Sequence, residues 1–218
     1  MKVLIYCGVN QGVGLLSMAE KNNWDKIYGF EANPHLCNEV RERCKNDSRI
    51  KILNAILSEQ HNEDSEFYII DPNESGKDCS SSVSKNFNPN YAKISGNRMK
   101  LKETLRLKTI NLYKFLQDEG ITEVEELLTD LEGSDLTVLK TLKPLIDSKK
   151  IKKIQCEVEP DHMPVKHDGL NNKFSDFEEL LKENYELVWK DNVPEHYFAV
   201  DCRWQIGGLA RSEWTLPK

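Results

Sequence analysis

The sequence has no apolar run long enough to cross a bilayer. Its first residues also lack the basic segment, apolar stretch and small-residue cleavage site of a signal peptide. We therefore expect a cytoplasmic protein with no membrane span. The six cysteines are scattered and form no C-x-x-C pair, which argues against a zinc site or a disulfide framework. Such cysteines are typical of reduced thiols packed in a core.

The sequence also lacks an excess of basic residues. It has 30 Lys and Arg against 36 Asp and Glu, which gives a formal net charge of −6. This balance does not favour binding to nucleic acid or to an anionic membrane. The 218 residues are 39% hydrophobic, enough for one sizeable core, so we expect a single domain over 1–218.

What the chain does contain is an alternation of strand-like and helix-like segments. This order predicts a Rossmann-like α/β fold: a doubly wound, mostly parallel sheet between two helical layers, with an antiparallel strand at the C-terminal edge. β-formers and helical spacing of apolar residues mark the segments. The expected strands are 2–6, 26–31, 50–57, 66–70, 124–133, 151–160, 185–190 and 196–204, and the expected helices are 13–19, 36–44, 109–120, 134–146 and 174–185.

Local signals predict several helix ends. Asn33 followed by Pro34 is a favourable N-cap with proline at the first helical position. Gly120 is a candidate C-cap, and Ser175-x-x-Glu178 has the pattern of a capping box. The segment 72–108 has little periodicity, so we expect a long loop that inserts into the domain as a lid.

The first strand ends in the glycine-rich segment "CGVNQGVG". It lacks the Gly-Lys-Ser/Thr of a P-loop, and Ser17 stands where the dinucleotide fingerprint G-x-G-x-x-G has its third glycine. Glu31 follows about twenty residues later at the tip of the second strand, where a carboxylate can accept hydrogen bonds from ribose hydroxyls. A loop whose glycines let the backbone approach a ligand, followed by this acid, indicates an adenosine-bearing ligand that need not contain a pyrophosphate.

The segments "YCGVNQGVG", "GFEANP", "LNAILSE", "CSSSV", "LLTDLEGSDLTVLKTL" and "IKKIQCEVEP" resemble the FkbM-type methyltransferases, in the right order from about Val3 to Pro160. The most specific part is the combination of "FEANP" with "DLEGSD". The resemblance implies a Rossmann-like enzyme that uses S-adenosylmethionine, commonly for O-methylation of sugars or natural products.

The resemblance also implies cofactor-binding positions. The loop would line the methionine and ribose side of the cofactor, Glu31 would hold the ribose, and Asp130 would lie near the sulfonium and the acceptor. The sequence departs from the family at Tyr6, where the family pattern has an aspartate that helps to hold the amino end of the cofactor. The full set of expected cofactor contacts is Gly8, Val9, Asn10, Gln11, Gly12, Glu31, Ala32, Asn33, Asn54, Ala55 and Asp130.

Acidic residues after later strands are candidates for catalysis. Methyl transfer to a hydroxyl is an in-line displacement that needs positioning and a base, and Asp130 is our first choice for that base. Glu132 and Glu157 are further catalytic candidates, although Glu132 is as well explained as a cap of the following helix. Pairs at 130/132 and 157/159, with Asp161 and His162 nearby, leave a divalent metal open as an alternative that we do not favour.

The segment from Lys85 to Lys108 is strongly basic within an acidic chain, with Lys85, Lys93, Arg98, Lys100, Lys102, Arg106 and Lys108 against Glu103 alone. A solvated loop is the common meaning of such a charge run. The alternative is a lid that attracts an anionic acceptor such as a phosphorylated sugar. Its few aromatic residues make nucleic acid the less favoured anion.

The loop, Glu31 and the family resemblance together predict an S-adenosylmethionine-dependent methyltransferase. The resemblance alone implies that it methylates a hydroxyl of a small-molecule or carbohydrate acceptor. The alternative, motivated by Tyr6, is a methyltransferase-like binding or regulatory module with weak or lost cofactor binding. A nicotinamide oxidoreductase is disfavoured because the third glycine is missing.

Overall fold

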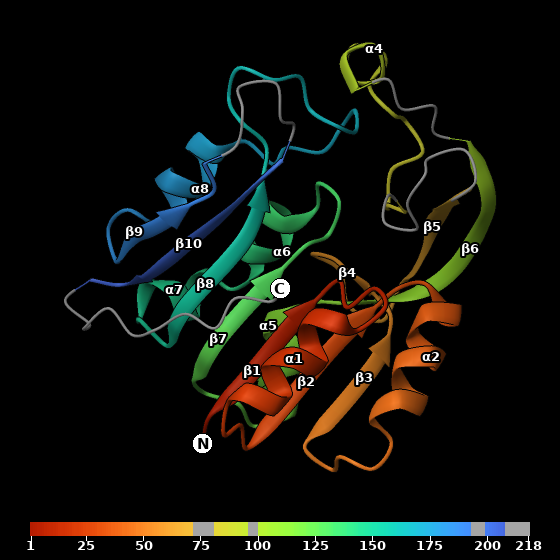
Figure 1. Ribbon diagram of the computed structural model, residues 1–218. Coiled ribbons are helices and arrows are strands. Elements are labelled where there is room, and N and C mark those ends of the chain that lie inside the picture. The colour runs from red at the N-terminus through yellow and green to blue at the C-terminus, as the bar shows by residue number, and fades with distance from the viewer. Residues whose placement is uncertain (72–80, 96–99, 193–198, 208–218) are drawn as a thin grey trace.

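The computed structural model describes residues 1–71, 81–95, 100–192 and 199–207 (Figure 1). Its main sheet has seven strands in the order β3-β2-β1-β7-β8-β10-β9. The first five of these are parallel, whereas β10 is antiparallel to both β8 and β9. The strands are β1 (Val3–Cys7), β2 (Lys26–Glu31), β3 (Ile50–Asn54), β7 (Val124–Thr129), β8 (Ile151–Val158), β9 (Tyr185–Lys190) and β10 (Val200–Ile206).

Helices cover both faces of this sheet. Apolar residues of α1 (Val13–Lys21) and α2 (Pro34–Cys44) pack on one face, in a cluster that includes Leu4 and Ile27. Residues of α5 (Leu112–Asp118), α6 (Asp135–Thr141), α7 (Lys143–Asp147) and α8 (Phe174–Leu181) pack on the other. The predicted Rossmann-like three-layer fold is therefore confirmed.

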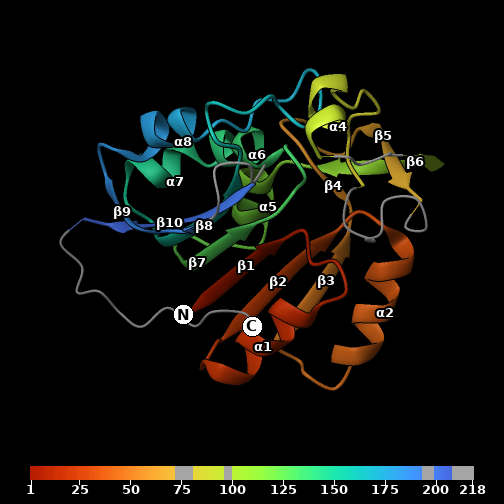
Figure 2. The same ribbon diagram turned by 45° about the horizontal axis from the view of Figure 1, so that its top comes forward.

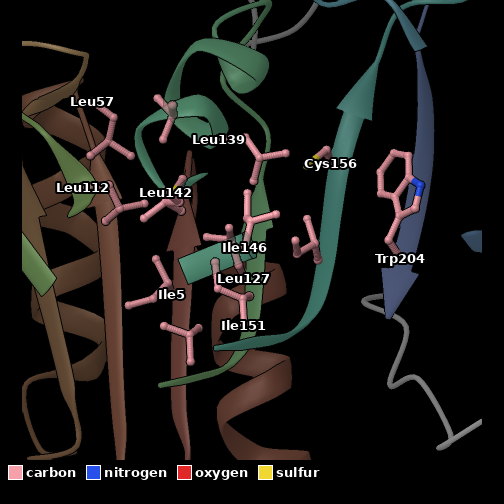
Figure 3. Packing of buried hydrophobic residues seen from close by; sticks show 14 of the residues in the cluster. Ile5, Leu57, Leu112, Leu127, Leu139, Leu142, Ile146, Ile151, Cys156 and Trp204 are labelled. Atoms are coloured by element: carbon pink, nitrogen blue, oxygen red, sulfur yellow. The ribbon is translucent and has the colours of Figure 1, made fainter. Parts of the chain in front are cut away.

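The larger core lies on the α5–α8 face. Figure 3 shows Ile5 and Leu127, from the adjacent strands β1 and β7, packed beside Leu139, Leu142 and Ile146. All five are almost completely buried. Strand residues alternate between the two faces, so Leu4 and Leu128 contribute to the opposite cluster. Both faces of the central strands are therefore apolar, as expected for a parallel sheet covered on both sides.

A second sheet has the order β4-β6-β5, with β4 (Ile56–Leu57), β5 (Asp64–Ile70) and β6 (Leu101–Ile110). It lies with the short helix α4 (Pro89–Ser95) beyond the β3 end of the main sheet (Figure 2). Its inner surface is apolar and includes Ile56, Phe67 and Ile69. This sheet forms one wall of the site described below.

Three sequence-based boundaries in this region were wrong. The expected strand 50–57 is interrupted at Ala55, and its two parts join different sheets. The expected loop is a strand from Leu101 onward, and the helix expected from 109 begins at Leu112. The reason is tertiary, because alternating Leu105 and Leu107 face the apolar cluster while charged neighbours face outward. The parts 72–80 and 96–99 of the expected lid lie outside the described residues.

Two of the three predicted helix ends are confirmed. The Asn33 side chain accepts the N–H of His35 at 3.0 Å, and Gly120 has a φ of 68° after the end of α5. The capping box was wrong, since α8 begins at Phe174 and Ser175 lies inside its first turn. Asp161 accepts the Ser175 N–H at 3.0 Å instead, and Glu178 accepts the indole N–H of Trp204 at 2.6 Å.

The described cysteines are Cys7, Cys37, Cys44, Cys156 and Cys202, and all five are buried free thiols. No described helix is both long enough and apolar enough to cross a membrane.

Candidate active site

A hollow lies where the carboxyl ends of β1, β2 and β7 approach the second sheet. It encloses about 710 Å³ of space, part of which is open solvent. Ligands of open α/β sheets bind at this edge. The lining residues are Gly8, Asn10, Phe30, Glu31, Ala32, Asn33, Leu36, Ala55, Ile56, Leu57, Phe67, Ser81, Val83, Asp130, Leu131, Glu132 and Ser134.

The loop after β1 is held tightly between its neighbours. The N–H groups of Gly8 and Val9 both donate to the carbonyl oxygen of Phe30, at 2.9 and 3.1 Å. Gly8 has a φ of 83°, and a side-chain carbon there would overlap the carbonyl oxygen of Asp130. Glycine at position 8 therefore lets the β1 and β7 loops meet at the floor of the hollow.

Glu31 connects the β1 and β2 loops. Its carboxylate accepts the N–H of Asn10 at 2.7 Å and that of Asn33 at 2.8 Å. Burial raises the pKa of Glu31, while these two hydrogen bonds lower it and the charge of Asp130 raises it further. Each carboxylate oxygen can accept more than one hydrogen bond, so Glu31 keeps acceptor capacity for a ligand.

Asp130 follows the last residue of β7, and its own N–H donates to the carbonyl oxygen of Cys7 at 3.0 Å. Its side chain reaches solvent in the hollow although protein surrounds the position. These surroundings raise the pKa of Asp130, and the ammonium group of Lys166 lowers it. A carboxylate whose pKa is raised toward neutrality suits proton transfer.

Asp135 and Asn172 support the loop that carries Asp130. Asp135 is fully buried and accepts the N–H of Leu131, and the Asn172 amide donates to its Oδ2 at 3.3 Å. The same amide donates to the carbonyl oxygen of Glu157 at 2.9 Å, and Asn172 Oδ1 accepts the N–H of Leu136 at 3.0 Å. One buried side chain thus joins β8, α6 and the β7 loop.

Glu132 lies in the hollow in a left-handed conformation, with a φ of 52°. Its carboxylate forms an ion pair with Lys166, and both side chains are largely buried. Its carbonyl oxygen accepts the hydroxyl of Ser82 at 3.3 Å. The N-cap of α6 is Ser134, so the helix-cap role considered for Glu132 is wrong.

A group of acids continues from Asp130 across the ends of the next strands. Glu157 on β8 lies opposite Asp201 on β10. Burial raises the pKa of Glu157, with further contributions from Asp130, Asp135, Asp201 and Glu159. Within the described part of the chain no group of three or more His, Cys, Asp or Glu could hold a metal ion. The residues present therefore do not support the metal alternative.

The segment 81–88 and the loop 160–172 are joined beside the hollow. The Asn88 N–H donates to the carbonyl oxygen of Lys166 at 3.0 Å, and the Asp168 N–H donates to that of Asn86 at 2.8 Å. The rings of Phe87 and His167 meet edge to face, with centroids 5.5 Å apart. Burial lowers the pKa of His167 to about 3, with a smaller contribution from Lys166, so the imidazole stays neutral.

The predicted residues divide into two groups. Those that line the hollow are Gly8, Asn10, Glu31, Ala32, Asn33, Ala55, Asp130 and Glu132. The others lie outside that lining: Val9 is in the core, Gly12 packs against Val40, and Gln11 accepts a hydrogen bond from Arg43. Asn54 donates to the carbonyl oxygens of Glu31 and Ala32, and Glu157 lies within electrostatic reach of Asp130.

Tyr6 does not line the hollow. Its ring packs against the α1 and α2 side of the sheet, and its hydroxyl lies against Gly14 of α1, where a side-chain carbon would overlap it. Burial raises the pKa of Tyr6, and the charges of Asp130 and Asp201 raise it further. The phenol therefore stays neutral and keeps its proton for hydrogen bonding.

Two cations of the basic segment, Arg106 and Lys108 on β6, do not face the hollow. Arg106 and Lys108 are exposed, lie on the face of β6 opposite to Leu105 and Leu107, and pair with Asp64 of β5 at 3.9 and 3.2 Å. Lys85 and Lys93 are exposed, and Arg98 lies outside the described residues. Instead, Lys166 places its charge beside Asp130 and Glu132.

Several lining residues were not predicted. Phe30, Leu36, Ile56, Leu57, Phe67 and Val83 form an apolar wall, and Ser81, Leu131 and Ser134 complete the lining. "CSSSV" carried part of this signal, since Ser81 and Val83 belong to it. Lys166 and Asn172 had no local signal, because the residues that tie them to the β7 loop and α6, Glu132 and Leu136, lie more than thirty residues away along the chain.

One family model covers most of the chain. Residues 7–187 match the model of the methyltransferase FkbM domain. A comparison with curated proteins gave no match.

Among solved structures, the chain is similar to the FkbM methyltransferase of Methylobacillus flagellatus KT, with 13% identity and a TM-score of 0.55. The match covers 94% of this chain and 43% of that one, so this chain spans less than half of that protein. TrmK of M. capricolum, in complex with S-adenosylhomocysteine, matches with 10% identity and a TM-score of 0.47, over 96% of this chain and 66% of that one. At 13% identity, the first similarity shows the fold alone.

Proposed function

The chain belongs to the FkbM methyltransferase family, and we propose that it transfers a methyl group from S-adenosylmethionine to a hydroxyl oxygen of a small-molecule or carbohydrate acceptor. The observation that carries this proposal is the position of Asp130. It lies in the hollow beside the β1 loop, with a raised pKa and a cation in reach.

The residues present fit the cofactor. The apolar wall that includes Phe30 and Phe67 suits an adenine ring, and Glu31 at the tip of β2 has acceptor capacity for ribose hydroxyls. Asn10 Oδ1 and Ser134 Oγ are buried in the lining without a hydrogen-bond partner among the described residues. Unsatisfied buried polar atoms in a cavity are expected where a ligand completes their hydrogen bonds.

When bound, S-adenosylmethionine would supply a methyl group from a positively charged sulfur, which would keep the electron pair of the broken carbon–sulfur bond as the acceptor oxygen takes the methyl. Asp130 accepts the hydroxyl proton in this proposal. The charge of Lys166 favours the ionised form of Asp130 against the acids around it.

Glu132 and Glu157 have supporting roles in the proposal. Glu132 holds Lys166 through their ion pair. Glu157 lies within electrostatic reach of Asp130, and burial and the surrounding acids raise its pKa, so Glu157 favours its protonated form beside an ionised Asp130. A site with this many carboxylates favours a neutral acceptor near the transferred methyl, because an anion would be repelled.

Calorimetry with S-adenosylhomocysteine tests the cofactor part. We expect wild-type binding, and a loss of roughly tenfold or more in Glu31→Ala, because charged hydrogen bonds are worth about 1.5–3 kcal/mol. Glu20→Ala, on the exposed side of α1, is the matched control. Unchanged affinity in Glu31→Ala would remove Glu31 from the ribose role.

Turnover tests the base. Asp130→Asn should abolish methyl transfer to any accepted hydroxyl compound while S-adenosylhomocysteine still binds. Retained turnover would mean that another group takes the proton. If the wild-type chain does not bind S-adenosylhomocysteine at millimolar concentration, the alternative of a binding or regulatory module, which Tyr6 motivates, replaces the enzyme.

A further inference from the structure

Tyr6 occupies the position where the FkbM family pattern has an acid. Its hydroxyl has a defined position in the structure. The hydroxyl meets the backbone of Gly14, in the first turn of α1, and only the absence of a side chain at Gly14 gives it room. It also lies within electrostatic reach of Asp130 and Asp201. The hydroxyl therefore lies near both the start of α1 and the acid that follows β7.

The start of α1 offers further hydrogen-bond donors there. The helix has nine residues, its N-cap is Gly12 with a φ of 78°, and no side chain caps it. The first N–H groups of an α-helix have no partner within the helix, and the helix dipole adds partial positive charge. The Tyr6 hydroxyl is held beside these groups, with its proton retained.

Acceptor groups line the neighbouring hollow. Asp130 carries a carboxylate, and Asn10 Oδ1 is buried without a hydrogen-bond partner among the described residues. An amino acid that extends from the hollow toward the start of α1 would meet acceptors at one end and donors at the other. The methionine part of the cofactor carries one carboxylate and one ammonium group, which need donors and acceptors respectively.

We propose that Tyr6 is a cofactor-binding residue whose hydroxyl donates a hydrogen bond to the carboxylate of the methionine moiety beside the N-terminus of α1. The ammonium group then contacts Asp130 and Asn10. Tyr6 thus replaces an acid that would hold the ammonium with a donor that holds the carboxylate. This inference rests on the proposed function, because it requires that the hollow binds the cofactor.

The test compares three ligands by calorimetry: S-adenosylhomocysteine, its decarboxylated analogue, which keeps the amine, and methylthioadenosine, which lacks both groups. In Tyr6→Phe the affinity for S-adenosylhomocysteine should fall roughly tenfold, the size expected for a hydrogen bond to a charged group. The affinities for the other two ligands should change less than about twofold. Tyr28→Phe is the matched control, since it removes a phenol hydroxyl that donates to Glu119.

Three outcomes overturn the proposal. An equal loss for all three ligands would mean that Tyr6 acts on the structure of the loop. An equal loss for the two amine-bearing ligands alone would assign the hydroxyl to the ammonium. Unchanged binding of S-adenosylhomocysteine would remove Tyr6 from the site while leaving the proposed function intact. By contrast, a wild-type chain that binds none of the three ligands would overturn the proposed function together with this inference.

Gly14→Ala provides a second, independent variant. The added methyl group overlaps the present position of the Tyr6 hydroxyl, so it displaces the hydroxyl while alanine favours the helix. We expect the same selective loss for S-adenosylhomocysteine, and no further loss when Gly14→Ala is added to Tyr6→Phe. Additive losses in the double variant would contradict a shared cause. The thermal unfolding midpoint of each variant shows whether it is folded.

Discussion

The buried carboxylate of Asp135 accepts the backbone N–H of Leu131, with donor–acceptor distances of 3.1 and 3.2 Å to its two oxygens. Leu131 lies between Asp130 and Glu132, so this contact fixes the backbone that presents both acids to the hollow. Asp135 is held in turn by Asn172. Residues outside the lining therefore determine the geometry of the residues that line the hollow.

Asn172→Leu should lower the free energy of unfolding by about 2–4 kcal/mol, because it leaves the Leu136 N–H and the Glu157 carbonyl without this buried partner. The adjacent Asn171 is exposed and its amide bonds to Asp176. Asn171→Leu is therefore the control and should cost less than about 0.5 kcal/mol. Urea unfolding of both variants measures the difference, and equal stabilities would contradict the role of Asn172.

Gly8→Ala should be much more harmful than Gly120→Ala, although both glycines have positive φ. The alanine at position 120 meets nothing within 4 Å, so its cost is the conformational strain of about 1 kcal/mol. At position 8 the methyl group overlaps Asp130, which should add about 1–3 kcal/mol. Equal unfolding free energies in urea would show that the β1 and β7 loops separate easily.

Lys166→Met should move the pH dependence of S-adenosylhomocysteine binding. Lys166 lowers the pKa of Asp130, so its removal raises that pKa and keeps Asp130 protonated to higher pH. If binding needs ionised Asp130, the affinity of Lys166→Met should begin to fall at a higher pH than that of the wild type when the solution is acidified. Lys166→Arg should restore the wild-type profile. Calorimetry from pH 5 to 9 measures the midpoint, and identical midpoints in the wild type and Lys166→Met would separate Lys166 from Asp130.

Stability should fall between pH 5 and pH 8. Burial raises the pKa of Glu126 and of Asp135 to about 7 and that of Asp201 to about 6, whereas acids in an unfolded chain titrate near pH ~4. Across this window the folded state holds protons that the unfolded state has released, so stability decreases as pH rises. His167, with a pKa of about 3, acts in the opposite direction below pH ~6.5, but it is one group against at least three.

Differential scanning calorimetry at constant ionic strength measures this fall as a lower Tm at pH 8 than at pH 5. Glu126→Gln removes one of the responsible groups at a distance from the hollow and should make the fall smaller. A wild-type Tm that rises over this range would contradict the raised pKa values.

The order of strands and helices could be predicted because apolar periodicity and glycine, asparagine and proline signals are local. The same local signals located Gly8, Glu31 and Asp130, since Glu31 is the last residue of a strand and the other two directly follow one. The strand β6 was missed because its outer face is charged and its inner face is apolar only through contact with β4 and β5. The charged residues of β6 therefore gave this part of the sequence the pattern expected of a loop.

The sequence by itself determined the Rossmann-like fold, the glycine loop and the acids at the strand ends, because these depend on residues close together in the chain. Only the tertiary structure decided how those groups are used. It paired Lys166 with Glu132, joined Asn172 to Asp135, and placed the Tyr6 hydroxyl against Gly14. Such contacts depend on how distant segments pack, and no local pattern of residue types specifies them.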